Sequence, residues 1–134
     1  MIVLCTIPHT GTQFFRGLLA QHYKPTGWDD TDPNGFITCH ITNDALTHIL
    51  DNRRNMTLVT TVRDWWAVQN SWQQRNRDFS EYPDYLGCWL DLILQNPFVL
   101  SVDHHKENRL KLLEQHLGVQ FKTDWTPVNE WNPS

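Results

Sequence analysis

The chain has 134 residues, of which 40% are hydrophobic and 19% are charged, and its net charge is −4. This length suits one domain with a real core, and the composition is not that of a disordered chain. The acidic balance argues against a general nucleic-acid binder, which normally carries a basic face. We therefore expect a single domain over residues 1–134 that binds no nucleic acid.

The sequence also argues against a membrane or disulfide-stabilised protein. No apolar run reaches the ~18 residues of a membrane span. The opening stretch MIVLCTIP has no basic flank, so we interpret it as a strand and not as a secretory signal. Cys5, Cys39 and Cys88 are odd in number, widely spaced and without a CxxC pair, which disfavours disulfides and structural zinc. We expect a cytoplasmic protein.

In chain order, short apolar runs at 2–7, 35–41, 56–62 and 98–102 predict four strands. Helical spacing predicts helices over 12–23, 43–54, 64–75, 82–95 and 106–118, with Thr42 capping the second and Gly118 ending the last. This alternation predicts a three-layer α/β sandwich around a parallel sheet, of a P-loop nucleotide-binding-like kind. In such sheets the ligand lies beyond the carboxyl ends of the strands.

The turn after the first strand reads PHTGTQF, residues 8–14. Gly11 lets the backbone approach a ligand, and the free N–H groups and positive dipole end of the next helix suit phosphate or sulfate. The Walker pattern is absent because no Lys follows Gly11. A plain strand–glycine–helix connection is the alternative.

This loop is similar to the first loop of the sulfotransferase family, PKSGTTW or PRSGTT, whose members transfer sulfuryl groups from 3′-phosphoadenosine 5′-phosphosulfate (PAPS). The resemblance implies that Phe14 stacks near the adenine. His9 stands where the family has Lys or Arg, and it could neutralise the leaving phosphate only if protonated, its ordinary pKa being ~6.5. The resemblance further implies that four residues hold the 5′-phosphosulfate: Thr10, Gly11, Thr12 and Gln13.

A second segment, TLVTTVRDWWAVQNSW (57–72), resembles the family's 3′-phosphate segment, a strand ending in Arg-(Asn/Asp)-Pro with a Ser eight residues after the Arg. Arg63 and Ser71 have this spacing, although Trp65 replaces the proline. A strand-end Arg can fork onto a phosphate, and a Ser two turns into the helix can donate a second hydrogen bond. Alternatively, Arg63 pairs with a carboxylate such as Asp64, and Ser71 is an ordinary helix residue.

A third segment, FITCHI (36–41), is similar to the family motif FIKTHLP, whose His is the catalytic base. The resemblance implies that His40 takes a proton from the attacking acceptor. Thr38 and Cys39 depart from the family, which usually has Lys and Thr there. The alternative is that His40 is only a polar strand end.

Two stretches raise the question of a metal. From Asp30 the sequence begins like an EF-hand loop, but its twelfth position is Ile41 where a bidentate Glu is needed, so we interpret the stretch as a turn. Asp103, His104 and His105 are adjacent, and neighbours on one strand point to opposite sides, so we favour a structural role. We expect no metal.

The sequence therefore predicts a minimal sulfotransferase with PAPS as donor, His40 and His9 as catalytic residues, and a hydroxyl or amine acceptor. A catalytically inactive module that binds PAPS, its 3′,5′-bisphosphate product or another nucleotide and acts through a partner is the alternative, favoured by the missing Lys residues. A nucleotide kinase is disfavoured, because a P-loop Lys is absent. The tail 122–134, with Trp125 and Trp131, could cover the site, and the seven Trp residues suit either a groove or the core.

Overall fold

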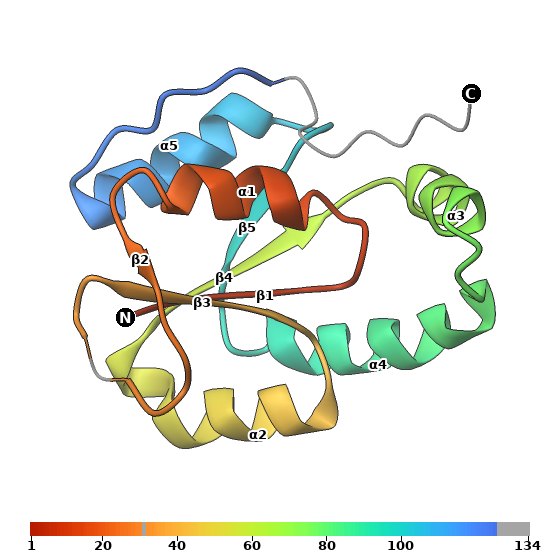
Figure 1. Ribbon diagram of the computed structural model, residues 1–134, viewed down its shortest axis with the longest axis horizontal. Coiled ribbons are helices and arrows are strands. Elements are labelled where there is room, and N and C mark those ends of the chain that lie inside the picture. The colour runs from red at the N-terminus through yellow and green to blue at the C-terminus, as the bar shows by residue number, and fades with distance from the viewer. Residues whose placement is uncertain (31, 126–134) are drawn as a thin grey trace.

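A five-stranded parallel sheet forms the centre of the molecule (Figure 1). The structure, a computed structural model, describes residues 1–30 and 32–125. Its strand order is β2–β3–β1–β4–β5. The strands are β1 (Ile2–Thr6), β2 (Lys24–Pro25), β3 (Gly35–His40), β4 (Thr57–Val62) and β5 (Phe98–Ser101).

Helices cover both faces of this sheet. Figure 1 shows α1 and α5 on one face and α2 and α4 on the other, with α3 beyond the ends of the strands. The predicted α/β class with a parallel sheet is confirmed. The helices are α1 (Thr12–Leu19), α2 (Asn43–Asn52), α3 (Trp65–Gln74), α4 (Tyr82–Ile93) and α5 (Lys106–Leu117), with 3₁₀ turns η1 (Arg53–Asn55) and η2 (Phe79–Glu81).

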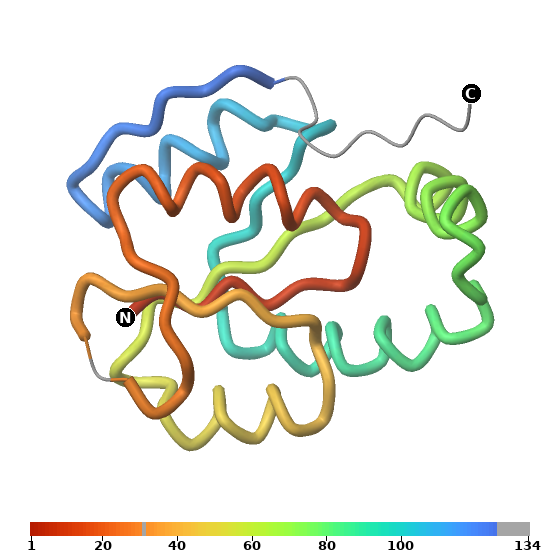
Figure 2. The backbone as a smooth tube through the Cα atoms, in the orientation of Figure 1, coloured from red at the N-terminus to blue at the C-terminus, as the bar shows by residue number. Residues whose placement is uncertain are grey.

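The central strand β1 is fully buried and sets the register of its neighbours. Thr6 of β1 lies opposite His40 of β3, and Val62 of β4 lies opposite Ser101 of β5. Because parallel strands end at the same edge, the segments that follow β1, β3, β4 and β5 come together there. Figure 2 shows the chain leaving these strands toward α1, α2 and α3 at one end of the sheet.

The fifth strand was not predicted. Strand β2 consists of Lys24 and Pro25 only, both exposed, at the edge of the sheet beside β3. The helix predicted over 12–23 would run almost to Pro25, but α1 already stops at Leu19. The backbone N–H of Lys24 donates to the carbonyl of Asn34, and Pro25 is tolerated because an edge strand has one unpaired side.

The tryptophans divide between the core and the surface. Trp72 is completely buried between α3 and the sheet. Trp65, on the same helix, is 45% exposed, and it stacks on Trp66, which is 68% exposed, with ring centroids 4.0 Å apart. The tryptophans therefore do not all belong to the core, and they do not all line a groove.

Local capping follows the sequence closely. The Thr42 side chain accepts a hydrogen bond from the N–H of Ala45 at the start of α2, as predicted. Gly118 ends α5 with φ 71°, a left-handed conformation that favours glycine. The carboxylate of Asp32 accepts from the backbone N–H of Asn34, a local bond typical of a turn.

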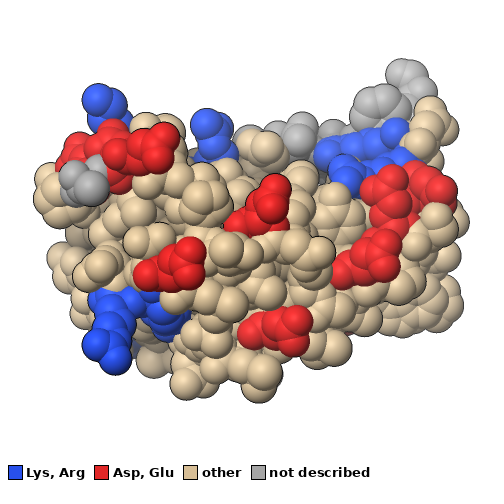
Figure 3. Space-filling view, turned by 90° about the horizontal axis from the view of Figure 1, so that it is seen from below, with Lys and Arg blue, Asp and Glu red and all other residues tan. Residues whose placement is uncertain are grey.

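Charge is spread over the face formed by α2 and α4. Figure 3 shows scattered acidic side chains there, with Lys and Arg in separate groups near the ends of the molecule. Among the described residues no helix is long and apolar enough to cross a bilayer. Cys5, Cys39 and Cys88 are free cysteines.

Candidate functional site

A cavity of about 310 Å³ lies beyond the carboxyl ends of the strands. This volume is at the small end of the range for ligand pockets. Its walls come from the β1–α1 loop, the start of α1, the end of β3, the segment after β4, and the far end of α3. The lining residues are Pro8, His9, Gly11, Thr12, Gln13, Phe14, His40, Arg63, Ser71, Arg75, Arg77 and Val102. All the predicted site residues except Thr10 are among them.

The β1–α1 loop is held to α3 through Trp72. Its indole Nε1 donates a hydrogen bond of 2.9 Å to the carbonyl oxygen of the buried Pro8. Gly11 has φ 94°, and a Cβ there would come within 3.2 Å of Cγ1 of Val102. Helix α1 begins directly after Gly11 without a side-chain cap, so its first N–H groups and positive dipole end face the cavity.

Two threonines of this loop use their hydroxyls inside the protein. Thr10 is buried and its hydroxyl donates to the carbonyl of Ile7 at 2.6 Å, with a short contact to the hydroxyl of Thr61. The hydroxyls of Thr12 and Thr6 lie 2.7 Å apart. Thr10 therefore shapes the loop and does not line the cavity, whereas Thr12 does both.

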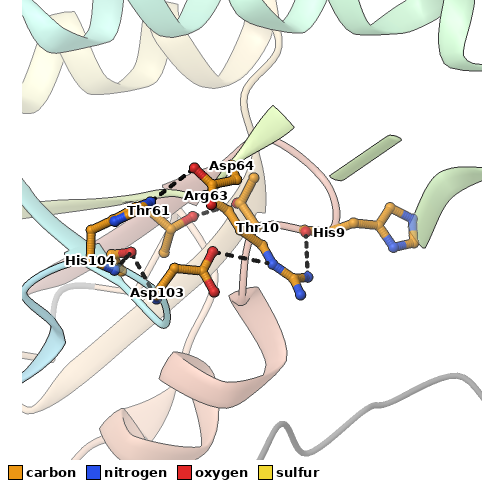
Figure 4. A network of polar contacts seen from close by, with 8 residues as sticks. His9, Thr10, Thr61, Arg63, Asp64, Asp103 and His104 are labelled. Carbon is orange, nitrogen blue, oxygen red and sulfur yellow. Dashed lines mark hydrogen bonds and ion pairs between the residues drawn. The ribbon is translucent and has the colours of Figure 1, made fainter. Parts of the chain in front are cut away.

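Arg63 reaches from the end of β4 back to the first loop (Figure 4). Its Nη1 donates to the carbonyl oxygen of His9 at 3.4 Å, and its Nε lies 3.6 Å from the carboxylate of Asp103. Asp64 is not its partner. Arg63 therefore does pair with a carboxylate, but with that of Asp103 in the segment between β5 and α5. Its guanidinium still lines the cavity.

The Asp103-His104 segment ties the loops after β4 and β5 together. His104 Nε2 lies 2.9 Å from Oδ1 of Asp64, and this hydrogen bond raises the pKa of His104 (Figure 4). Within residues 1–30 and 32–125, no three His, Cys, Asp or Glu side chains are grouped as metal ligands. The pairs made by Asp103 and His104 support the structural role that we favoured for this stretch.

His9 is surrounded by hydrogen-bond donors and positive charge. Its Nδ1 lies 3.0 Å from Nη1 of Arg75 and 3.1 Å from the hydroxyl of Ser71. A guanidinium can only donate, so Nδ1 accepts and the neutral ring carries its proton on Nε2. Burial, followed by the charges of Arg75, Arg77, His40 and Arg63, lowers the pKa of His9 to about 4. Near neutral pH the ring of His9 is therefore uncharged in this structure, so it does not supply the positive charge of the Lys that it replaces.

Arg75 and Arg77 supply positive charge that the motifs did not reveal. Ser71 lies in α3 and Arg75 is the C-cap of that helix. Because the two residues are four positions apart, they lie on the same face of the helix. Asn76 has φ 55°, which turns the chain and brings Arg77 over the ring of Trp72 at 4.6 Å. The spacing of Ser71 and Arg75 was a usable signal, but the turn at Asn76 was not visible in any periodic pattern.

Two guanidinium nitrogens of residues that line the cavity are shielded from water. Nε of Arg63 and Nε of Arg77 have no hydrogen-bond acceptor among the described residues, although both belong to guanidinium groups that line the cavity. The carboxylates nearest to them, Asp103 and Glu81, lie at 3.6 Å from these side chains and outside the lining. A cavity with three guanidinium groups and no lining carboxylate favours an anionic ligand.

His40 stands at the end of β3 on the opposite wall. Its side chain is exposed at the cavity, and burial by the surrounding wall, followed by the charge of Arg77, lowers its pKa. The ring is therefore neutral at neutral pH and able to accept a proton. Strand β3 carries it to the same edge of the sheet as His9 and Arg63, because β1 and β3 run in register.

Phe14 lies on the cavity wall but one of its faces is already covered. Its ring stacks on Trp125 with centroids 5.2 Å apart, and Lys106 lies over the same indole. Residues 119–125 run along α1 and α5, where Gln21 and Lys122 exchange two hydrogen bonds of 2.8 Å. The rest of the suggested cover, including Trp131, lies outside the described residues.

Comparisons with known proteins found no matching family model, no matching curated protein and no matching solved structure.

Proposed function

We propose that this cavity binds PAPS and its 3′,5′-bisphosphate product. One observation carries the proposal: Arg63 and Ser71, which are far from the first loop in the sequence, both contact His9 of that loop and line one cavity with the start of α1. A cluster of guanidinium groups beside an uncapped helix start is a site for phosphate or sulfate. The guanidinium groups of Arg63, Arg75 and Arg77 all line the cavity, and each can donate hydrogen bonds to such a ligand.

In this proposal each wall has its own task. Arg63 and Ser71 bind the 3′-phosphate, while the first N–H groups of α1 bind the 5′-phosphosulfate. Arg75 and Arg77 supply the positive charge that a Lys at position 9 would otherwise give. Ser71 would donate to the phosphate with the hydroxyl that now donates to His9.

The reaction that we propose is sulfuryl transfer to a hydroxyl or amine. PAPS supplies the sulfuryl group: the acceptor atom forms a bond to sulfur, the bond from sulfur to the 5′-phosphate oxygen breaks, and the bisphosphate leaves with that electron pair. His40 takes the proton of the acceptor, a role that its lowered pKa supports because the ring is neutral at neutral pH. The guanidinium groups stabilise the negative charge that develops on the leaving oxygen.

A non-catalytic nucleotide-binding module is the second candidate. It is favoured by the neutral His9 and by Thr38, because neither provides the fixed positive charge that Lys would give at these two places. In this candidate the same walls bind the bisphosphate without turnover.

Transfer of labelled sulfuryl from PAPS to a panel of phenols, sugars and amines tests the enzymatic proposal. We expect the wild-type chain to label at least one acceptor, and His40→Gln to lower the rate by roughly 10²–10⁴-fold while bisphosphate binding persists. His48→Gln, a change on the exposed face of α2, is the matched control. Binding without any transfer would favour the second candidate, and unchanged transfer by His40→Gln would exclude His40 as the base.

A further inference from the structure

His9 holds an unusual position for a residue that faces an anion site. Its backbone has φ 68°, a conformation that non-glycine residues rarely adopt, and its ring Nδ1 accepts from Arg75 and Ser71. The backbone is fixed from two sides, by Arg63 on the carbonyl of His9 and by Trp72 on the carbonyl of Pro8. The backbone that carries the ring is therefore fixed, and the two partners of Nδ1 are contacts that a bound anion can exchange.

Within residues 1–30 and 32–125, the charged groups that face the His9 ring are all basic. Arg63 approaches from the segment after β4, Arg75 and Arg77 from the end of α3, and His40 from the end of β3. No carboxylate lines the cavity in the described part of the chain. This environment keeps the ring neutral only while the cavity holds no negative charge, since an anion within ~4–6 Å favours the protonated form.

We propose that the cavity binds its anion together with one proton, which His9 takes up when the anion draws the Arg75 guanidinium away from Nδ1. The inference rests on the proposed function for the identity of the physiological anion, the phosphosulfate end of PAPS. Arg75 would exchange one acceptor, the imidazole nitrogen, for another, the anion. Ser71 then turns its hydroxyl so that it accepts from Nδ1 or donates to the anion, Nδ1 gains a proton, and His9 becomes the cation that a Lys would be permanently.

Proton uptake predicts a definite pH dependence of affinity. The pKa of His9 is about 4 in the structure and returns to its ordinary value or higher beside a bound anion. Between these two values, each pH unit of acidification strengthens binding by up to about tenfold, because the bound state holds one more proton than the free state. Above the pKa of the bound state the affinity no longer depends on His9.

Inorganic sulfate is the probe, because it stays fully ionised over this range and adds no titration of its own. The proton NMR signal of the His9 ring is followed from about pH 4 to about pH 8, with and without saturating sulfate. We expect the midpoint for His9 to rise by more than one pH unit when sulfate is bound. An unchanged midpoint at saturation, or no sulfate binding at any pH, would overturn the inference.

Variants give a second readout through the sulfate dissociation constant at about pH 5 and about pH 7. His9→Asn keeps an acceptor near the place of Nδ1, tolerates positive φ and cannot be protonated, so we expect it to lose most of the roughly tenfold or greater gain on acidification. His40→Gln should keep that gain, and His48→Asn is the control outside the cavity. A full gain in His9→Asn would contradict the inference even if the variant binds well.

The two proposals fail differently. If the 3′,5′-bisphosphate binds tightly but the His9 midpoint does not move with sulfate or with the bisphosphate, the proton-linked mechanism is wrong and the nucleotide site stands. If sulfate binds with proton uptake but the bisphosphate binds no better than sulfate, the proposed function is wrong and the inference stands.

Discussion

The indole Nε1 of Trp72 lies 2.9 Å from the carbonyl oxygen of Pro8. Through this bond a buried residue of α3 fixes the loop that carries His9 and Gly11, so the stability of the core and the shape of the cavity depend on the same side chain. Trp72 also supports Arg77, whose guanidinium lies 4.6 Å from the centre of its ring.

Trp72→Phe should therefore lower both stability and anion affinity. The phenyl ring retains much of the packing, but the buried carbonyl of Pro8 loses its donor, so we expect the free energy of unfolding to fall by about 1–3 kcal/mol. Chemical denaturation measures this change. Trp66→Phe is the control, since Trp66 is 68% exposed, and it should change stability by less than about 0.5 kcal/mol. Equal effects of the two variants would contradict the assigned role of Trp72.

Two glycines, one at the start of α1 and one inside it, provide a matched pair. Gly11→Ala places a Cβ in a left-handed conformation and 3.2 Å from Val102, so we expect a loss of about 1–2 kcal/mol or more. Gly17 lies within α1 and an added Cβ there meets nothing within 4 Å. Gly17→Ala should stabilise the protein by about 0.5–1 kcal/mol. We expect the denaturation midpoint to shift downward for Gly11→Ala and upward for Gly17→Ala. A stabilised Gly11→Ala would contradict the left-handed conformation at residue 11.

His9 should make the ligand-free protein less stable in acid. Its folded pKa of about 4 lies below its ordinary value, so between the two the unfolded chain binds more protons than the folded one. Stability is therefore complete above about pH 6.5 and falls as the pH drops toward about 4. Because the ring is partly exposed, we expect a loss on the order of 1–2 kcal/mol.

Urea denaturation in sulfate-free buffer across this pH range measures that loss, and His9→Asn should show less of it than the wild type. His48→Asn keeps His9 and should follow the wild-type curve. The difference in free energy of unfolding between the wild type and His9→Asn should fall toward acid. If this difference rises toward acid instead, the neutral state of the ring is contradicted.

Much of this arrangement was predictable because the strands are short, apolar and followed by polar residues. The convergence of residues 9–14, 40 and 63 followed from the rule that parallel strands end at one edge, and all of these residues except Thr10 do line one cavity. Strand β2 was missed because Lys24 and Pro25 are exposed and show no strand periodicity. Arg77 was missed because its place depends on the left-handed turn at Asn76 and on contact with Trp72, which are tertiary features.

The inward orientation of Thr10 was also beyond the sequence. A hydroxyl in a loop of this kind is expected to bind the ligand. The hydroxyl of Thr10 instead contacts the hydroxyl of Thr61 in β4. A helix over 64–75 was predicted, but the exposure of the stacked pair Trp65 and Trp66 was not, because α3 extends beyond the sheet and no layer in the described part of the chain covers that side.

The most direct measurement is the calorimetric dissociation constant of adenosine 3′,5′-bisphosphate for the wild type, Arg63→Gln and Arg54→Gln. Arg63 lines the cavity, whereas Arg54 is an exposed residue of η1 outside it. We predict saturable one-to-one binding that Arg63→Gln weakens by at least about tenfold, about 1.4 kcal/mol, while Arg54→Gln leaves it within about twofold. No saturable binding by the wild type, or equal weakening by the two variants, would contradict the assignment of this cavity to a bisphosphorylated adenosine.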